Sequence, residues 1–128
     1  MRRGMLLFAH GARDPRWSAP FEAVARRVRE ADQALAVELA YLELMAPTLR
    51  QAGERLVAQG CTTVEVVPLF LGAGGHVRHD LPVLLAELGA SHAGVQWRLR
   101  PAIGEAPMVI EAMAMTARAW IESPAGGA

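Results

Sequence analysis

The feature of this 128-residue chain that most restricts its fold is a fourfold alternation between strand-like and helix-like segments. Four short runs, apolar or alternating, each precede a segment whose apolar residues recur at the period of a helix. Strands separated by helices are joined by right-handed crossovers and form a parallel sheet. We therefore expect an α/β domain with helices on both faces of the sheet.

The expected strands cover residues 5–9, 37–42, 63–71 and 95–99. The first and third are continuous apolar runs, which is typical of strands covered on both faces, so we expect them at the centre of the sheet. The second and fourth alternate apolar and polar residues, which indicates edge strands. These assignments predict the order 2-1-3-4, a short flavodoxin-like sheet.

The helical segments carry apolar stripes, and several residues mark where the helices begin and end. We expect the third helix to begin with Asp80 as its N-cap and to stop at Gly89, and the last helix to open at Pro107. The stripe of the last helix is Ile110, Met113, Ala114, Ala117 and Ile121. The length and the single set of elements predict one domain over residues 1–122, followed by a frayed tail at 123–128.

Charge and composition restrict the possible partners. Thirteen basic residues balance thirteen acidic ones, which gives no excess of positive charge for non-specific binding to nucleic acid. No apolar run approaches the roughly 20 residues of a membrane span, and the one near the N-terminus is shorter than a secretory signal requires. We therefore expect a cytoplasmic protein without membrane contact. Cys61 cannot form an internal disulfide and is expected to be a small buried hydrophobe.

Candidate functional residues follow the strands directly. His10 comes after the first strand, and His76 lies in the glycine-rich segment after the third. In the order 2-1-3-4 these two loops meet where the chain direction switches, which is the ligand crevice of such sheets. Glu43 follows the second strand and is flanked by Leu42 and Leu44, and a free carboxylate is costly among apolar side chains.

Two imidazoles and a carboxylate suit cobalt, iron, nickel or zinc and leave coordination positions open for a substrate. Neutral imidazole can also take up a proton near neutral pH. A single histidine would more often be structural or solvated. The pair His10 and His76 in facing loops, with Glu43 at the same edge, therefore predicts a metal-handling site.

Arginines and glycines flank these loops. Arg13, Arg16 and Arg78 are either solvated charges or holders of carboxylates through fork-shaped hydrogen bonds. Gly74 and Gly75 lie in a loop that lacks the Lys-Ser/Thr of a phosphate-binding loop. We interpret these two glycines as a place where the backbone can approach a flat ligand closely.

The other two histidines are assigned no part in the chemistry. His79 stands three residues after His76, and its position before Asp80 favours a role at the start of a helix over a role as a ligand. His92 lies in a polar loop, where we expect it to be exposed and inert.

Together, several segments resemble the short-type class II chelatases of sirohydrochlorin, the cobaltochelatase and ferrochelatase relatives of cobalamin and siroheme synthesis. The matching segments are residues 7–15, 41–44 with Pro47, 67–71 with Gly75 and His76, 80–82, and 101–104 with Pro107. The resemblance covers residues 5–121. It implies metal binding by His10 and His76 with Glu43 as a third participant, and it departs from the family at Ala12, where serine is common.

The resemblance also implies a reaction. It is the insertion of a divalent metal ion into sirohydrochlorin, with Co²⁺ preferred to Fe²⁺ or Ni²⁺ and without an organic cofactor. The tetrapyrrole is the expected partner, and a homodimer is expected because one small domain offers only one wall of a cleft. A non-catalytic metal chaperone or metal-binding module stays open as the alternative function.

Overall fold

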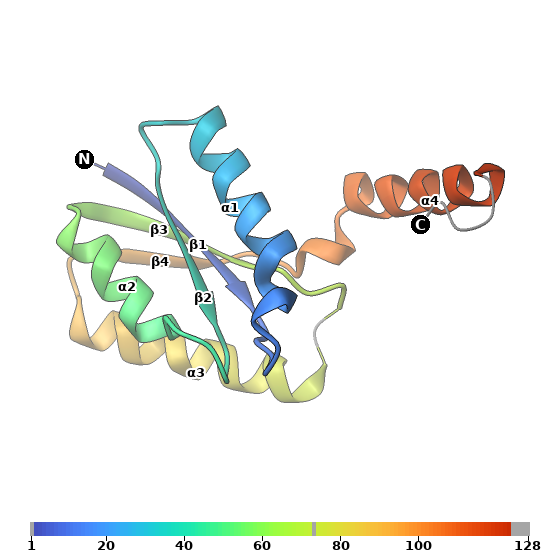
Figure 1. The fold of residues 1–128 in the computed structure, drawn as a ribbon. Helices are drawn as coiled ribbons and strands as arrows, with labels where there is room; N and C mark the ends of the chain where they lie inside the picture. The colour runs from blue at the N-terminus through green and yellow to red at the C-terminus, as the bar shows by residue number, and fades with distance from the viewer. Residues whose placement is uncertain (1, 73, 124–128) are drawn as a thin grey trace.

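The structure, a computed structural model, describes residues 2–72 and 74–123, and of His76 the backbone alone. Its centre is a parallel sheet in the order β2-β1-β3-β4, so the strand order predicted from the sequence is confirmed (Figure 1). The strands are β1 (Arg2–Ala9), β2 (Ala36–Tyr41), β3 (Cys61–Pro68) and β4 (Gln96–Leu99).

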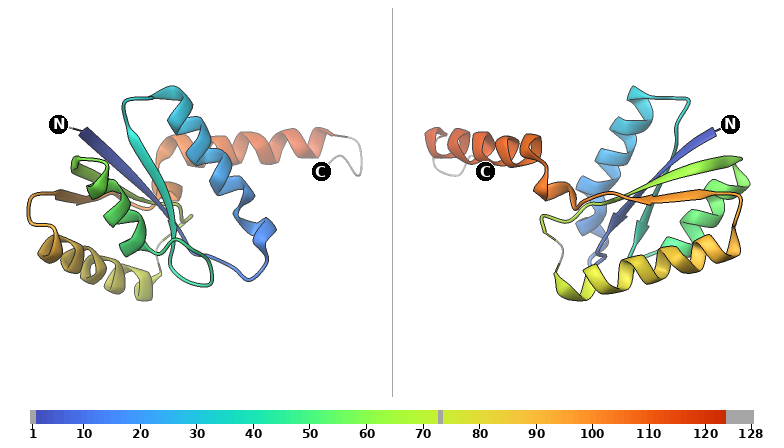
Figure 2. Two further views of the ribbon diagram at one scale, coloured as in Figure 1. Left: turned by 60° about the vertical axis from the view of Figure 1, so that its left-hand side comes forward. Right: turned by 180° about the vertical axis from the view of Figure 1, so that it is seen from behind.

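The helices lie on both faces of the sheet, as predicted. The α-helices are α1 (Ala19–Ala31), α2 (Leu49–Ala58), α3 (Gly75–Ser91) and α4 (Pro107–Glu122), and two 3-10 turns are η1 (Pro15–Ser18) and η2 (Ile103–Glu105). α1 covers one face, and α2 and α3 cover the other (Figures 1 and 2). Over the described parts of the chain, no helix is both long and apolar enough to cross a membrane.

The central position of β1 follows from its continuous apolar run. Leu6 and Phe8 point into the core shared with α2 and α3, and Leu7 points into the core beneath α1. All three side chains are at most 2% exposed. A strand buried on both faces needs apolar residues at every position, and this fixes β1 between β2 and β3.

The two edge strands differ in how they are covered, and the alternation predicted for β2 is not seen in its burial, because Ala36 and Ala40 are buried in the core of α2 and α3. In β2, Val37 and Leu39 pack towards α1. In β4, Trp97 packs towards the core of α2 and α3, while Gln96 and Arg98 are exposed. β2 is thus covered on both faces although it lies at an edge, whereas β4 has one apolar face.

The third helix begins earlier than predicted. Asp80 was expected to be its N-cap, but α3 starts at Gly75, with Gly74 as an N-cap of extended backbone. The physical reason is packing, because Val77 and Leu81 lie four residues apart and both pack against the core of α2 and α3. The segment that was predicted to be a glycine-rich loop through His76 is therefore helical from residue 75 onward.

The last helix has the predicted bounds within a residue, yet it does not pack on the sheet. None of its residues is buried, and its apolar stripe is exposed. In Figure 1, α4 extends away from the rest of the molecule after η2. The predicted tail lies, from residue 124 onward, outside the described residues.

Candidate functional site

The loop after β2 continues the hydrogen bonding of the sheet beyond the strands. The Leu42 N–H donates to the Ala9 carbonyl at 2.9 Å, and the Glu43 N–H donates to the His10 carbonyl at 3.1 Å. These two bonds hold the first residues after β1 and β2 side by side. They therefore bring the side chains of His10 and Glu43 to one place at the carboxyl edge of the sheet.

The two side chains are in contact. Nε2 of His10 lies 3.4 Å from Oε1 of Glu43, and the side chains are 49% and 57% exposed. A carboxylate at this distance can accept a hydrogen bond from an imidazole N–H. The pair is open to solvent on one side, so an incoming ion or ligand can reach both groups.

The predicted apolar surroundings of Glu43 are wrong, although the residue lies at the predicted edge of the sheet. Glu43 was expected to be enclosed by apolar neighbours, but Leu44 is 58% exposed. Leu44 has φ of 65°, in the left-handed region, which turns the chain and directs its side chain outward. Contact with His10, and not apolar burial, distinguishes this carboxylate.

Gly11 allows the two loops to approach this closely. It has φ of 97°, and a Cβ at this position would collide with the Glu43 carbonyl oxygen. Only glycine combines this backbone conformation with the missing side chain. The Gly11 that follows His10 is therefore required by the contact between the loops.

Phe70 forms a wall beside His10. The ring centroids of Phe70 and His10 are 6.3 Å apart with planes at 70°, and Phe70 also packs edge-on against Phe8 at 6.0 Å. Phe70 was not among the site residues predicted from the sequence. Its position two residues past β3, the strand beside β1, was the available signal.

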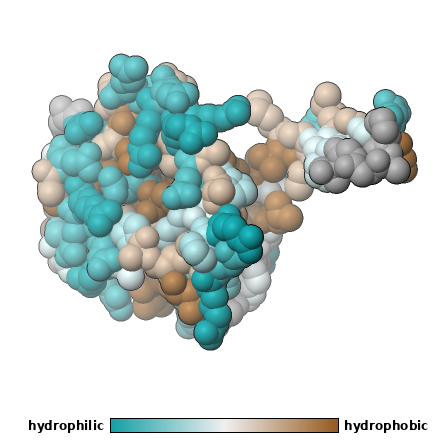
Figure 3. Space-filling view, viewed as in Figure 1, coloured by the Kyte–Doolittle hydropathy of each residue, from teal (hydrophilic) through white to brown (hydrophobic). Residues whose placement is uncertain are grey.

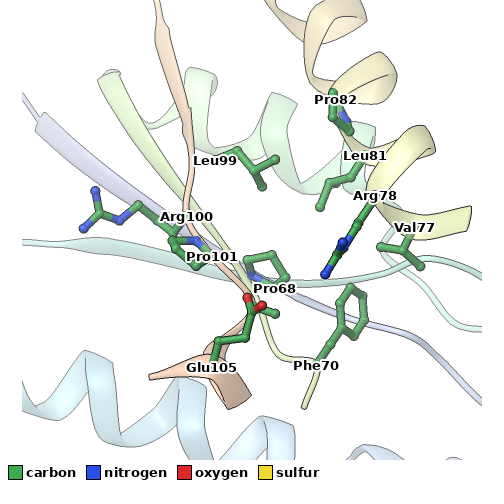
Figure 4. Close-up of a pocket in the computed structure, with 11 residues that line it drawn as sticks. Pro68, Phe70, Val77, Arg78, Leu81, Pro82, Leu99, Arg100, Pro101 and Glu105 are labelled. Atoms are coloured by element: carbon green, nitrogen blue, oxygen red, sulfur yellow. The ribbon is translucent and has the colours of Figure 1, made fainter. Parts of the chain in front are cut away.

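A pocket of about 300 Å³ opens next to this wall, between the start of α3 and the segment after β4. Its lining consists of Pro68, Phe70, Val77, Arg78, Leu81, Pro82, Leu99, Arg100, Pro101, Ala102 and Glu105. Figure 4 shows the Arg78 side chain directed toward Phe70 and Pro68, whereas Arg100 points away from them. Arg78, predicted as a substrate-binding residue, thus borders an apolar hollow that shares Phe70 with His10.

His76 is the second residue of α3, the helix that begins after the carboxyl end of β3. Its side chain lies outside the described residues, and its predicted role as a metal ligand stays a prediction. Gly74 and Gly75 are exposed, and a Cβ on either would meet no atom of the described residues within 4 Å. The space above this turn is therefore open, as a close approach by a ligand requires.

The two arginines after β1 differ in their surroundings. Arg16 forms a two-pronged ion pair with Asp14, with Nη2 2.9 Å from Oδ2, and the Asp14 carboxylate also accepts from the Arg16 backbone. These bonds lower the pKa of Asp14 and raise that of Arg16. Arg16 therefore helps Asp14 to cap η1, whereas Arg13 is an exposed side chain between His10 and that turn.

Comparison with known proteins places this fold and site in a family. The sequence model of the CbiX family matches residues 4–119. The chain belongs to the CbiX family. The expectation drawn from the resemblance is thereby confirmed at the level of the family.

Named relatives of this CbiX chain include chelatases of two kinds. The sirohydrochlorin cobaltochelatase of Methanocaldococcus jannaschii is 33% identical over 88 residues, which are 69% of this chain and 62% of that protein. The sirohydrochlorin ferrochelatase of Bacillus subtilis is 27% identical over 113 residues, 88% of this chain and 43% of that protein. The match thus spans less than two thirds of each relative's length.

Solved structures share the fold of this CbiX chain. A protein of Marinobacter aquaeolei VT8, described as a cobalamin biosynthesis CbiX protein, matches with a TM-score of 0.82 and 38% identity over 94% of this chain and 98% of that one. The sirohydrochlorin chelatase SirB of Bacillus subtilis subspecies spizizenii, in complex with cobalt, matches with a TM-score of 0.82 and 27% identity, over 93% of this chain and 51% of SirB.

The remaining candidates of this CbiX chain lie apart from the His10–Glu43 pair. His79 is exposed within α3 and does not cap it. His92, expected to be exposed, is 24% exposed, because its ring packs 6.5 Å from Trp97 and its Nε2 lies 3.9 Å from Glu54. Cys61 is buried, as predicted, and burial raises the pKa of its thiol.

Among the side chains that the structure describes, no group of three or more His, Cys, Asp and Glu forms a metal cluster. His10 and Glu43 are brought together as a pair, and His76 is the predicted third participant whose side chain is not among those described.

Proposed function

We propose that this chain inserts a divalent metal ion into sirohydrochlorin. The observation that carries the proposal is the contact between His10 and Glu43 at the ligand-binding edge of a CbiX-family sheet. Relatives named sirohydrochlorin cobaltochelatase and sirohydrochlorin ferrochelatase support the substrate. No organic cofactor is needed, because metal insertion exchanges protons for a cation without a change of redox state.

The metal that we propose is Co²⁺, with Fe²⁺ and Ni²⁺ as substitutes. Support for cobalt comes from the names of the archaeal relatives and from the cobalt complex of SirB, and support for iron comes from the ferrochelatase relatives. Imidazole nitrogen and carboxylate oxygen are suitable ligands for each of these ions. In this reaction the metal ion is a substrate.

In the proposed mechanism His10 and His76 hold the ion and the arginines hold the macrocycle. Arg78 borders the apolar pocket, and Arg13 lies on the open side after β1. Both can bind the acidic side chains of the tetrapyrrole through paired hydrogen bonds. Arg16 is given a smaller part, since its guanidinium already pairs with Asp14.

The exchange at the ring needs proton acceptors. Two pyrrole N–H bonds break as the metal forms bonds to the ring nitrogens, and the two protons must leave the macrocycle. Glu43 can accept the two protons one after the other, because its exposed carboxylate can release the first proton to solvent before it takes up the second. The protons then reach solvent through the exposed side of the pair.

We also propose that the working form is a homodimer in the cytoplasm. The pocket of about 300 Å³ is at the small end of ligand sites, and a tetrapyrrole needs a second wall. The free thiol of Cys61 is consistent with a reducing compartment.

The test is a direct assay. Purified protein is incubated with sirohydrochlorin and Co²⁺, and the absorbance of the metal-free macrocycle is followed against a control without enzyme. Acceleration with repeated turnover supports the proposal. Binding of Co²⁺ without acceleration would instead support a metal chaperone, the alternative function. Parallel reactions with Fe²⁺ and Ni²⁺ rank the metals.

A further inference from the structure

The imidazole of His10 is exposed, yet it has to present its nitrogens in a fixed direction in order to hold a metal ion. The backbone of His10 is fixed, because its carbonyl accepts a hydrogen bond from the Glu43 N–H at 3.1 Å. Its side chain is 49% exposed, and the Glu43 side chain beside it is 57% exposed. Exposed side chains change rotamer within nanoseconds. Contact with Glu43 alone therefore leaves the direction of the imidazole poorly fixed.

A second contact to the imidazole comes from the ring of Phe70. The ring centroids of Phe70 and His10 are 6.3 Å apart, and the ring planes are at 70°. Edge-to-face pairs of aromatic rings attract at this separation, because the positive edge of one ring meets the negative face of the other. Such a pair favours one angle between the two planes, which an ordinary apolar contact does not. Phe70 therefore restrains how far the imidazole can turn.

The Phe70 ring is itself anchored in the core. It packs edge-on against Phe8 at 6.0 Å with planes at 71°, and Phe8 is 0% exposed. Phe8 and His10 are two residues apart where the hydrogen bonding of the sheet continues, so their side chains lie on the same face of the sheet. One ring thus contacts both side chains. Phe70 connects the exposed imidazole to a side chain that core packing holds in place.

Backbone hydrogen bonds hold Phe70 from two directions. The Leu69 N–H donates to the Phe8 carbonyl at 2.7 Å, which extends the pairing of β3 with β1. The Phe70 carbonyl accepts from the Gly104 N–H at 2.9 Å, and a Cβ on Gly104 would collide with the backbone of Leu71. This second contact lies just before α4, and Figure 3 shows apolar residues at the surface where the body meets that helix. The backbone of Phe70 is therefore fixed on both sides of the residue.

Phe70 also lines the pocket of about 300 Å³ that Arg78 borders (Figure 4). A change at Phe70 can therefore act on the macrocycle in this pocket as well as on the direction of His10. The two effects are separable, because an effect through His10 is present before any macrocycle is added. The metal-free protein and its complex with Co²⁺ alone are the states in which the contribution of Phe70 to His10 can be measured.

We propose that Phe70 is a positioning residue for His10, and that its edge-on ring, anchored on Phe8, sets the direction of the imidazole. The consequence for metal binding rests on the proposed function, in which His10 holds the ion, but the orientation of the imidazole does not. Residues that orient a metal ligand contribute about 10- to 100-fold to the affinity for the metal. We expect the lower end of this range, since the contact is between rings and is not a hydrogen bond.

The first test uses the metal-free protein. The chain has four histidines, and the ring C–H signals of His10 are identified in a proton–carbon NMR spectrum by their absence from His10→Ala. In the parent protein these signals should show a nuclear Overhauser contact to the Phe70 ring. They should move towards random-coil positions in Phe70→Leu and stay near the parent positions in Phe70→Tyr, which keeps the ring.

Phe21→Leu is the matched control for this test. Phe21 is also partly buried, but it packs against Trp17 with ring centroids 4.6 Å apart, so its replacement should leave the His10 signals in place. A parent protein without the Overhauser contact, or His10 signals that do not move in Phe70→Leu, overturns the proposal. The contact in the parent decides the question even where Phe70→Leu is too unstable to examine.

The second test asks whether Phe70 acts through His10. The dissociation constant for Co²⁺ is measured by calorimetry, without tetrapyrrole, for the parent, Phe70→Leu, His10→Ala and the double variant. Phe70→Leu should weaken binding about 10-fold in the parent background. It should have no further effect in the His10→Ala background, because the ligand that it orients is gone. Phe70→Tyr should bind Co²⁺ as the parent does.

Equal losses of affinity from Phe70→Leu in the two backgrounds would show that Phe70 acts independently of His10, which overturns the proposal. Failure of the proposed function gives a different result, namely Co²⁺ binding that is the same in His10→Ala and in the parent. In that case the NMR spectra of the metal-free protein decide by themselves whether Phe70 orients the imidazole.

Discussion

His10 and Glu43 gain their importance from each other. Each alone is an exposed polar residue after a strand, a position where such residues are common. Their separation of 3.4 Å couples a potential metal ligand to a potential proton acceptor. The edge-on Phe70 ring limits the directions from which the His10 ring can be approached. The chemistry of the site can therefore be tested one side chain at a time.

Replacing His10 by alanine should reduce metal insertion by at least about 100-fold, because the change removes a metal ligand and the proton partner of Glu43. The imidazole is 49% exposed, so the thermal midpoint should change little. His92→Asn is the matched histidine control, because His92 caps the C-terminal end of α3, away from the His76 end of that helix. This variant should keep its activity. Insertion by His10→Ala near the parent rate, with unchanged circular dichroism, would remove His10 from the site.

Glu43→Gln should slow turnover by about 10²-fold or more while the affinity for Co²⁺ changes less, because the amide keeps the shape but cannot accept a proton. The measurements are the insertion rate between pH 6 and 9 and the dissociation constant for Co²⁺. A rate that is unchanged across this range would exclude Glu43 as a base. A large loss of affinity with little change in rate would make it a ligand instead.

At the scale of the elements, the site depends on two loops that are hydrogen-bonded as an extension of the sheet. Gly11 permits this by its left-handed backbone and by the absence of a side chain beside the Glu43 carbonyl. Gly60, which follows α2, has a similar φ of 86° but open space around it. An alanine at Gly60 would therefore suffer backbone strain alone, whereas an alanine at Gly11 would suffer the same strain and also collide with the Glu43 carbonyl.

Gly11→Ala should destabilise the fold by more than about 2 kcal/mol and should also reduce metal insertion, since the loops must move apart. Gly60→Ala carries the backbone strain alone and should cost about 1 kcal/mol with activity retained. Urea unfolding and the insertion assay on both variants provide the comparison. Equal losses of stability in the two variants would show that the close approach of the loops at Gly11 contributes nothing.

For the molecule as a whole, the buried side chains of Cys61 and Tyr41 should make the free energy of unfolding depend on pH. Burial raises the pKa of the Cys61 thiol above 9.0 and that of the Tyr41 phenol above 10.0. The folded protein thus keeps both protons to a higher pH than the unfolded chain does. The stabilisation from these groups is complete below about pH 9 and is lost as the pH rises through the folded-state values.

The urea midpoint should therefore fall as the pH is raised from 8 to 10.5. Cys61→Ala removes the thiol contribution, so the decline in that variant should begin at a higher pH. The measurement is a set of urea unfolding curves monitored by circular dichroism in the presence of a reductant. A midpoint that stays constant to pH 10.5 in the parent protein would contradict the prediction.

Much of the fold follows from patterns that are local in the sequence. The apolar run of β1 indicates a strand covered on both faces, and the alternating sequences of β2 and β4 predicted their positions at the edges. With right-handed crossovers these features determine the order β2-β1-β3-β4. The order places the residues after β1, β2 and β3 at one edge, which is why His10 and Glu43 could be selected before their contact was known.

The tertiary structure alone decided the properties that depend on distant contacts. Glu43 is exposed because the backbone turns at Leu44, and α3 starts at Gly75 because Val77 reaches the core. Periodicity predicted α4 and the apolar side that it must bury, but the direction in which it leaves the sheet depends on how Gly104 fits against Leu71. The local sequence pattern identifies the apolar face of each helix and strand, because such faces avoid water. Which other element each apolar face packs against is determined by contacts between residues far apart in the sequence.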